Sequence, residues 1–309
     1  MRQLLIINDL CGYGKVATTA MLPILSYMGV PTFNLPTALV SNNLEYGKFS
    51  LLETTDYIKD SFRVWKELGF TYDAIATGFM ASEQQARIIA AYCREQALQN
   101  GTAIYVDPIM GDEGKLYNGI SQATINAMRQ MISVAHLCFP NYTEACYLTD
   151  TPYHPEGITR DEAFALVDKL RAMGSRSVLI TSIPVDGKMS VVGYNASVAA
   201  APNLLKEEKL SCAPAAVASE YNTIEYTSPS GKIGEASFCL TYEEIPVRIP
   251  GTGDIFSAVV IGNLLNGTEL KVSTRRAMDI VRSLIDENKD MPDRYRGIPL
   301  ERFLHHLDA

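Results

Sequence analysis

The segment AIATGFMASEQQARIIAAYCREQALQNGTAIYVD, residues 74–107, has an apolar run at each end and a long helical pattern between them. Ala74–Thr77 and Ala103–Asp107 have the length and the apolar composition of buried strands. From Ser82 to Gln99 apolar residues recur about every 3.6 positions, and Ser82-Glu-Gln-Gln85 has the form of a capping box at a helix start. A strand, a helix and a strand at this spacing predict two parallel neighbours joined by a right-handed crossover.

The same alternation of strands and helices continues on both sides of this segment. Further buried strands are predicted at Leu4–Asn8, Thr32–Leu35, His136–Phe139 and Ser177–Thr181. Further helices are predicted at Val16–Met28, Leu51–Leu68, Ser121–Ser133, Thr159–Met173, Thr252–Asn266 and Glu269–Glu287. Repeated units of this kind predict an α/β fold in which helices cover both faces of a mostly parallel sheet.

One later region, Asp186–Val247, has a different pattern. Lys188–Tyr194 and Ala236–Leu240 alternate apolar and polar residues, which predicts antiparallel hairpins, and Pro229–Gly234 would serve as a turn. Within this region, Ala196–Ser219 is rich in Ala, Pro and Ser and is predicted to be a surface excursion. No internal repeat is found, and we expect residues 1–309 to form a single domain.

The composition is that of an ordinary globular protein, and it argues against several classes of partner. Of 309 residues, 47% are hydrophobic and 20% are charged, with a formal net charge of -8 and a pI near 5.1. An acidic chain offers no basic surface to release counterions, so we expect neither a nucleic-acid partner nor an anionic membrane surface. No apolar stretch reaches the ~18 residues needed to span a bilayer.

The cysteines and the first residues favour a reducing compartment. The six cysteines are scattered without a Cys-x-x-Cys pair, which predicts small buried side chains rather than a disulfide framework. The start, Met1–Ile7, runs directly into a strand-like segment and is too short for a signal peptide. We therefore expect a cytoplasmic location.

A glycine-rich turn, Gly12-Tyr-Gly-Lys-Val-Ala17, follows the first predicted strand and fits the Gly-x-Gly-x-x-Ala form of a dinucleotide fingerprint. That fingerprint also requires an acidic residue about 20 positions on, at the end of the next strand. Here the next strand ends at Asn34-Leu-Pro36, and no carboxylate follows until Glu45. The sequence therefore disfavours a dehydrogenase and leaves two interpretations of the glycines, a ligand-approaching loop or a plain tight turn.

A second glycine-rich run, Pro250-Gly-Thr-Gly-Asp254, stands directly before an apolar helical segment. Unpaired N–H groups and the helix dipole at such a start form a nest for negative charge on a transferring phosphoryl group. Asp254 could then accept the proton of an attacking hydroxyl. The alternative is a glycine-rich turn in which Asp254 is an ordinary N-cap. The phosphate loop of P-loop enzymes and the protein-kinase motifs are both absent from the sequence.

Four motifs, taken in order along the chain, resemble those of the ribokinase-like superfamily. They are Val106-Asp-Pro-Ile-Met-Gly-Asp112, Pro140-Asn-Tyr-Thr-Glu144, Ile180-Thr-Ser182 and Gly251-Thr-Gly-Asp254. The resemblance extends over nearly the whole chain and is closest to the pyridoxal and pyridoxamine kinases. It implies a three-layer αβα sandwich, a homodimer, and ATP-dependent phosphorylation of the 5'-hydroxymethyl group of pyridoxal, pyridoxine or pyridoxamine. It also implies Mg²⁺, with room for a monovalent cation.

The resemblance also implies roles for the motif residues. Asp254 would be the catalytic base, and Gly251, Thr252 and Gly253 would complete the anion nest. Asp112 and Glu144 would be the Mg²⁺ partners, directly or through water. The ATP phosphates would be bordered by Asp107, Asn141, Glu144, Thr181, Ser182 and Thr252. Independently of the resemblance, carboxylates at the carboxyl ends of parallel strands suit Mg²⁺, a hard ion that bridges phosphates.

On the substrate side, the same resemblance implies contacts to the vitamin from Asn8, Asp9, Ser41, Asn42, Phe79 and Asp254. Two positions depart from the family pattern. Leu44 stands where many pyridoxal kinases have Thr, and Phe79 stands where they have a Tyr. Two alternatives therefore stay open: a hydroxymethylpyrimidine kinase of thiamine synthesis, and a non-catalytic protein that binds pyridoxal phosphate.

Overall fold

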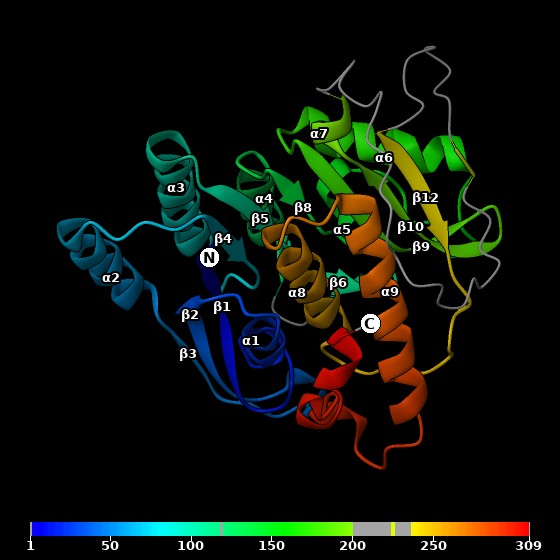
Figure 1. The fold of residues 1–309 in the computed structure, drawn as a ribbon, viewed down its shortest axis with the longest axis horizontal. Helices are drawn as coiled ribbons and strands as arrows, with labels where there is room; N and C mark the ends of the chain where they lie inside the picture. The colour runs from blue at the N-terminus through cyan, green and yellow to red at the C-terminus, as the bar shows by residue number, and fades with distance from the viewer. Residues whose placement is uncertain (1, 118–119, 200–223, 226–235, 309) are drawn as a thin grey trace.

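The computed structural model describes residues 2–117, 120–199, 224–225 and 236–308. In this part of the chain one sheet contains ten strands, in the order β11-β12-β10-β9-β8-β5-β4-β1-β2-β3 (Figure 1). The strands are β1 Leu4–Tyr13, β2 Thr32–Asn42, β3 Leu51–Glu53, β4 Ala74–Thr77, β5 Ala103–Val106, β8 Leu137–Cys138, β9 Ser177–Val185, β10 Lys188–Tyr194, β11 Ile224–Glu225 and β12 Ser237–Thr241. The six strands from β2 to β9 are parallel, and the pairs at both ends of the sheet are antiparallel.

Helices lie on both faces of this sheet. They are α1 Thr18–Tyr27, α2 Thr55–Leu68, α3 Glu83–Asn100, α4 Gln122–Ile132, α5 Tyr142–Thr149, α6 Arg160–Ala172, α7 Ala196–Ala199, α8 Thr252–Leu265 and α9 Leu270–Asn288. Short elements complete the chain: β6 Gly111–Asp112, β7 Lys115–Leu116, and the 3₁₀ turns η1 Leu44–Tyr46, η2 Arg294–Arg296, η3 Leu300–Arg302 and η4 Leu304–Asp308.

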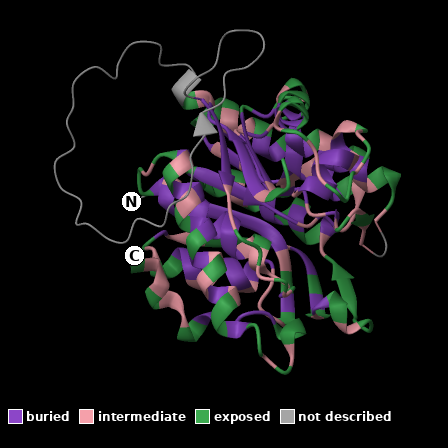
Figure 2. Cartoon of the chain, turned by 90° about the vertical axis from the view of Figure 1, so that its right-hand side faces the viewer, coloured by how far each residue is buried: buried purple, intermediate pink, exposed green. Residues whose placement is uncertain are grey.

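Two hydrophobic clusters, one on each face of the sheet, hold the layers together. Because successive strand residues point to opposite faces, Leu5 and Ile7 of β1 join the cluster under α2 to α6, whereas Leu4 and Ile6 join the cluster under α1, α8 and α9. All four side chains are buried, and Figure 2 shows the strands between the layers as largely buried. The predicted three-layer αβα architecture is confirmed.

The predicted strand–helix–strand unit of residues 74–107 is present as β4, α3 and β5. Its two strands are parallel neighbours, with Ala74 paired to Ala103 and Thr77 to Val106. Ser82 caps α3, because its hydroxyl accepts the Gln85 N–H at 3.3 Å. In a regular capping box the Gln85 side chain would accept the N–H of the N-cap residue, Ser82. Here it accepts the N–H of the preceding residue, Ala81.

Some predicted boundaries are wrong. Residues Leu51–Glu53 were expected in a helix that runs to Leu68, but they form β3, which pairs antiparallel with Ala38–Val40 of β2. The helix begins only at Thr55, because the backbone of the preceding residues is engaged by the neighbouring strand. The helix α5 was not predicted, although Asn141 and Glu144 form a capping box at its start that the sequence already contains.

The antiparallel region late in the chain is confirmed where it is described. Residues Lys188–Tyr194 form β10, which pairs with β9 on one side and β12 on the other. The turn predicted at Pro229–Gly234 and residues 200–219 of the predicted excursion lie outside the described residues. Ala196–Ala199, the start of the excursion, is the short helix α7. The continuous sheet is compatible with one domain over residues 1–309, which stays a prediction.

Candidate active site

Several of the predicted site residues lie near the carboxyl ends of the parallel strands. Asn8 and Asp9 lie in β1, Phe79 follows β4, and Asp107 follows β5. The first turn of α8, which contains Asp254, faces this edge. Asp254 is close enough to Asp9 and to Asp107 to raise the pKa of both carboxyl groups. Side chains separated by up to 245 positions in the sequence therefore share one electrostatic environment.

Asp254 is not the N-cap of its helix. The N-cap is Gly251, with φ 87° and ψ -1°, which places Asp254 in the third position of the first turn. Its Oδ2 accepts a hydrogen bond from the backbone N–H of Ala17 at 2.8 Å. Burial raises the pKa of Asp254 from 3.8 to about 6, against the opposing effect of hydrogen bonds from Ala17 and from the side chain of Asn8. The interpretation of Asp254 as a plain cap is wrong.

The two glycines before Asp254 differ in whether the structure requires a glycine at their position. Gly251 has a left-handed φ, and a Cβ at this position would lie 2.3 Å from the Lys15 carbonyl oxygen, so a side chain cannot be accommodated. Gly253 has open space around the position of a Cβ. The first N–H groups of a helix have no partner within it, and the N-cap of this helix lies three residues before Asp254, whose charge acts on Asp9 and Asp107. The arrangement is suited to hold an anion close to the backbone.

Asp9 lies beside Asp254 and is only partly exposed. Burial, followed by the negative charge of Asp254, raises the pKa of Asp9 from 3.8 to about 7. Neighbouring Asn8 is 2% exposed and uses its Oδ1 to accept the N–H groups of Phe79 at 2.8 Å and of Asp9 at 3.0 Å. A Cβ at Gly78 would lie 2.4 Å from this carboxamide, which explains the glycine. Asn8 therefore orients Phe79 and Asp9, while Asp9 itself faces the site.

A second group of acids lies on the other side of the site. Burial and the charges of Glu144 and Asp254 raise the pKa of Asp107 well above its ordinary value. Burial raises the pKa of Glu144 to about 8 and also raises the pKa of Asp112. Neighbouring buried carboxyl groups whose pKa values are raised in this way favour a cation close to them.

Glu144 and Asn141 bind the loop before β6 to the start of α5. The Glu144 carboxylate accepts the N–H groups of Met110 at 2.9 Å and of Asn141 at 2.8 Å, one on each oxygen. The Asn141 side chain accepts from Glu144 N–H at 2.9 Å and donates to the Gly111 carbonyl at 2.8 Å. Glu144, a predicted Mg²⁺ partner, and Asn141, a predicted neighbour of the ATP phosphates, thus hold the backbone beside Asp112.

The described acidic side chains could provide Mg²⁺ with one or two carboxylate ligands, but not with a complete set. Among the described residues, no group of three or more His, Cys, Asp or Glu side chains converges to form a metal cage. Mg²⁺ commonly binds one or two carboxylates together with waters and substrate phosphates, so partly exposed Asp112 beside Glu144 satisfies this requirement. Asp112 also lies 4.0 Å from the guanidinium of Arg248, which forms a closer ion pair with Glu45 at 3.1 Å. Arg248 was not predicted from the sequence.

The predicted nucleotide-side residues of β9 lie next to Asn141. Thr181 forms a parallel bridge with Asn141, and its N–H donates to the Pro140 carbonyl at 3.0 Å. Ser182 is exposed and has a left-handed φ of 53°, which interrupts the regular strand conformation. Thr252, in the first turn of α8, is partly exposed.

Ser41 and Asn42 do not contact the acidic group around Asp254 in the described part of the chain. The Ser41 hydroxyl donates to the Asn42 side chain at 2.7 Å, and Asn42 donates to the Lys48 carbonyl at 2.8 Å. These two residues therefore stabilise the loop that contains η1, and no contact from either to Asp254 is found among the described residues. The buried residue of this segment is Asn43, which sequence reasoning missed. Leu44, the departure from the family pattern, is 37% exposed.

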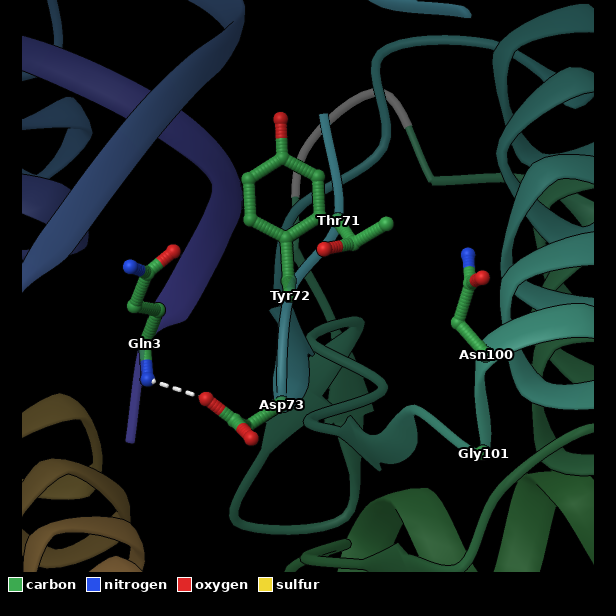
Figure 3. A pocket seen from close by; sticks show the side chains of 6 residues that line it. All are labelled: Gln3, Thr71, Tyr72, Asp73, Asn100 and Gly101. Atoms are coloured by element: carbon green, nitrogen blue, oxygen red, sulfur yellow. Dashed lines mark hydrogen bonds between the residues drawn. The ribbon is translucent and has the colours of Figure 1, made fainter. Parts of the chain in front are cut away.

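A separate hollow of about 380 Å³ lies at the opposite edge of the sheet (Figure 3). Gln3 precedes β1, Asp73 precedes β4 and Gly101 precedes β5, and the Gln3 N–H donates to Asp73 at 2.7 Å. Ligands in open α/β sheets bind at the carboxyl ends of the strands, whereas this hollow lies at the amino ends. It is therefore distinct from the candidate active site.

The fold and the acidic edge define a protein of the ribokinase-like class. The sequence model of the phosphomethylpyrimidine kinase family matches residues 19–210. The chain belongs to this family.

Solved structures extend the comparison to the full chain. A putative phosphomethylpyrimidine kinase from Bacteroides thetaiotaomicron, crystallised with pyridoxal, is 32% identical with a TM-score of 0.82, covering 100% of this chain and 96% of that one. The pyridoxal kinase of Lactobacillus plantarum is 23% identical with a TM-score of 0.78, over 99% of this chain and 96% of that one, and shares the fold.

Curated relatives give shorter matches. The pyridoxal kinase of Arabidopsis thaliana is 28% identical over 227 residues, which are 71% of this chain and 60% of that protein. The match to the pyridoxal kinase of Sus scrofa covers 62% of this chain and 52% of that protein at 27% identity. The chain thus spans about half to three fifths of the length of these two curated relatives. No helix in the described residues is long and apolar enough to cross a membrane.

The raised pKa values of Asp9 and Asp254 predict the pH dependence of stability. Both folded-state pKa values lie above 3.8, so folding favours the protonated carboxyls. Their stabilising contribution is complete at low pH and is lost as the pH rises through about 6 to 7. Without ligands, Asp9→Asn should therefore raise the thermal unfolding midpoint at pH 8 more than at pH 5, by on the order of a few degrees.

The control for this experiment is Asp60→Asn on the exposed face of α2, where the same chemical change should shift both midpoints equally. An Asp9→Asn effect that is the same at both pH values would contradict the assigned cause.

Proposed function

We propose that this protein transfers the γ-phosphoryl group of ATP to the 5'-hydroxymethyl group of pyridoxal, pyridoxine or pyridoxamine. The observation that supports this most directly is the Asp254 carboxylate, held by Ala17 N–H in the first turn of a helix that begins at Gly251. The solved relative of the same family that contains pyridoxal supports the choice of substrate. The free and buried state of all five described cysteines supports a cytoplasmic location.

In the proposed reaction, Asp254 accepts the proton of the substrate hydroxyl. The hydroxyl oxygen forms a new bond to the γ-phosphorus while the bond from that phosphorus to the β–γ bridging oxygen breaks, and ADP leaves. The N–H groups of Gly251, Thr252 and Gly253 stabilise the charge that develops on the phosphoryl oxygens. A pKa of about 6 keeps Asp254 largely ionised at neutral pH and still basic enough to take a proton.

The nucleotide is proposed to lie along the ends of β5, β8 and β9. Asp107, Asn141, Thr181, Ser182 and Thr252 border its phosphates in this proposal. Mg²⁺, when bound, neutralises phosphate charge, and Asp112 would hold it directly with Glu144 acting through water. A monovalent cation is compatible with the same acidic edge.

A second candidate is a hydroxymethylpyrimidine kinase, because the family to which the chain belongs is described as phosphomethylpyrimidine kinase. Both reactions phosphorylate a hydroxymethyl group on a nitrogen heterocycle and require the same base, so the ring pocket decides between them. A non-catalytic pyridoxal phosphate binder is the remaining alternative, and the presence of Asp254, held by the Ala17 N–H, argues against it.

Asp254→Asn should lower kcat by about 10²–10⁴-fold, because the amide cannot accept the proton. The affinity for ADP should change less than about threefold, since binding does not depend on the base. Coupled ADP release measures the rate, and calorimetry measures ADP binding. Asp286→Asn, at an exposed ion pair with Lys289, is the control and should retain wild-type kinetics. Full kcat in Asp254→Asn would exclude it as the base.

The values of kcat/KM for pyridoxal and for hydroxymethylpyrimidine, measured side by side, distinguish the two candidate functions. We expect the vitamin to be preferred by at least about tenfold, which corresponds to about 1.4 kcal/mol of transition-state binding. Phe79, oriented by Asn8, provides an aromatic surface for the ring. A preference for the pyrimidine would establish the second candidate instead.

We also propose that the chain forms a homodimer through the β1–β3 end of the sheet. Leu10, Leu39 and Leu52 are register partners across three strands and are 39%, 41% and 62% exposed. Such an exposed apolar row on an edge of a sheet is typical of an interface between chains.

Light scattering after gel filtration tests this assembly. The wild type should have the mass of a dimer, and Leu52→Glu should have that of a monomer, because a charge in the row is costly to bury. Leu98→Glu, at an 80% exposed position on α3, introduces the same charge elsewhere and should leave the dimer intact. A monomeric wild type, or a dimeric Leu52→Glu, would contradict this proposal.

A further inference from the structure

The chain after α9 returns to the candidate active site. We call residues Asp293–Gly297, which contain η2, the C-terminal clamp. The Arg296 carbonyl accepts a hydrogen bond from the Lys15 N–H at 2.7 Å, in the turn between β1 and α1. The side chains of Lys15 and Glu301 add an ion pair between the same two parts of the chain.

The clamp also holds the end of β2. The Asn43 side chain donates to the Tyr295 carbonyl at 2.8 Å, and the Tyr46 hydroxyl donates to Asp293 at 2.6 Å. The rings of Tyr46 and Tyr295 pack edge to face with centroids 5.4 Å apart. Because Asn43 N–H donates in turn to the Tyr13 carbonyl at 3.0 Å, the clamp, the β2 end and the β1–α1 turn form one connected unit.

The Lys15 carbonyl lies between two glycines, one from the clamp and one from the α8 turn. A Cβ at Gly297 would lie 2.7 Å from this oxygen, and a Cβ at Gly251 would lie 2.3 Å from it. Both glycines have a left-handed φ, 72° and 87° respectively. The position of Lys15 is therefore fixed by direct packing from the clamp on one side and from the helix of Asp254 on the other.

Two residues further on, Ala17 is in a conformation that alanine rarely adopts. It is 4% exposed with φ 50° and ψ -135°, and its N–H points to Asp254 at 2.8 Å. The Thr19 hydroxyl closes the same turn by contacts of 2.8 Å and 2.7 Å to the Gly14 and Val16 carbonyls. An unfavourable backbone conformation persists only where the surroundings enforce it, and here they include the clamp.

We propose that the C-terminal clamp is a positioning device for catalysis, which holds Ala17 N–H on the Asp254 carboxylate. The inference rests on the proposed role of Asp254 as the base. The groups facing Asp254 are Asn8, which donates to it, and the acids Asp9 and Asp107. Loss of the Ala17 bond leaves the carboxylate with less stabilisation against these acids, so its proton affinity rises and its orientation is less defined.

Gly297→Ala tests the proposal, because the added Cβ displaces Lys15 and with it Ala17. The expected result is a drop in kcat of about tenfold to a hundredfold, as for a small misplacement of a catalytic group. The acidic limb of the pH profile should move upward by up to about one pH unit, as expected for a weakened charge-assisted hydrogen bond. The affinity for ADP should stay within about twofold, since the clamp does not border the proposed nucleotide site.

Gly267→Ala is the matched control. It places the same methyl group at a left-handed φ of 91°, after α8, where nothing lies within 4 Å of the new atom. It should therefore introduce a methyl group at a left-handed φ without a contact to Lys15, and kcat and the pH profile should not change. Tyr46→Phe removes only the hydroxyl bond to Asp293 and should give a smaller change in the same direction, which keeps the test valid if Gly297→Ala does not fold.

An activity-independent readout separates this proposal from the proposed function. In protein labelled with ¹⁵N-alanine, the Ala17 amide signal should titrate with Asp254, with a midpoint of about 6 in the wild type and higher in Gly297→Ala. An unchanged Ala17 titration together with wild-type kcat in both clamp variants would overturn the positioning role. A shifted titration in a protein that phosphorylates no vitamer would sustain the clamp and refute the proposed reaction.

Discussion

The burial of several carboxylates at one edge of the sheet is the constraint on which the rest of the site depends. Asp254 raises the pKa of both Asp9 and Asp107, and burial raises all three. Such a cluster is electrostatically unfavourable unless hydrogen bonds or cations offset it. Backbone hydrogen bonds provide part of the offset: the Ala17 N–H donates to Asp254, and the Met110 N–H donates to Glu144. A divalent cation such as the proposed Mg²⁺ would offset further negative charge at this edge.

These N–H groups are available only because distant segments pack closely. Gly251 allows the start of α8 to touch the Lys15 carbonyl, and Gly297 allows the C-terminal clamp to touch the same atom. The turn at Ala17 is held between the start of α8 and the C-terminal clamp. In this turn Ala17 has a strained backbone conformation, and its N–H donates to Asp254. The geometry of the Asp254 carboxylate thus depends on the β1–α1 turn, the α8 turn and the C-terminal segment together.

Most of the architecture could be predicted from the sequence, because strand and helix periods are local properties. Ala74–Thr77 and Lys188–Tyr194 match their predicted bounds, and the acids at the strand ends follow from the parallel order. Leu51–Glu53 was assigned to a helix because pairing with β2 is a long-range contact that no local pattern reveals. Arg248 and Asn43 could not be predicted for the same reason, because their contacts are also long-range. Their partners, Glu45 and Tyr295, are 203 and 252 positions away. Only α5 had an unused local signal, the capping box of Asn141 and Glu144.

The central claim is that Asp254 activates a hydroxymethyl group of a B6 vitamer for attack on ATP. Product analysis by ³¹P NMR tests it most directly, with pyridoxal, ATP and Mg²⁺ supplied to the wild type and to Asp254→Asn. The account predicts one equivalent of a phosphate monoester on the 5' oxygen for each ADP formed by the wild type, and almost none with the variant. Formation of ADP without the pyridoxal ester, or equal ester formation by both proteins, would contradict it.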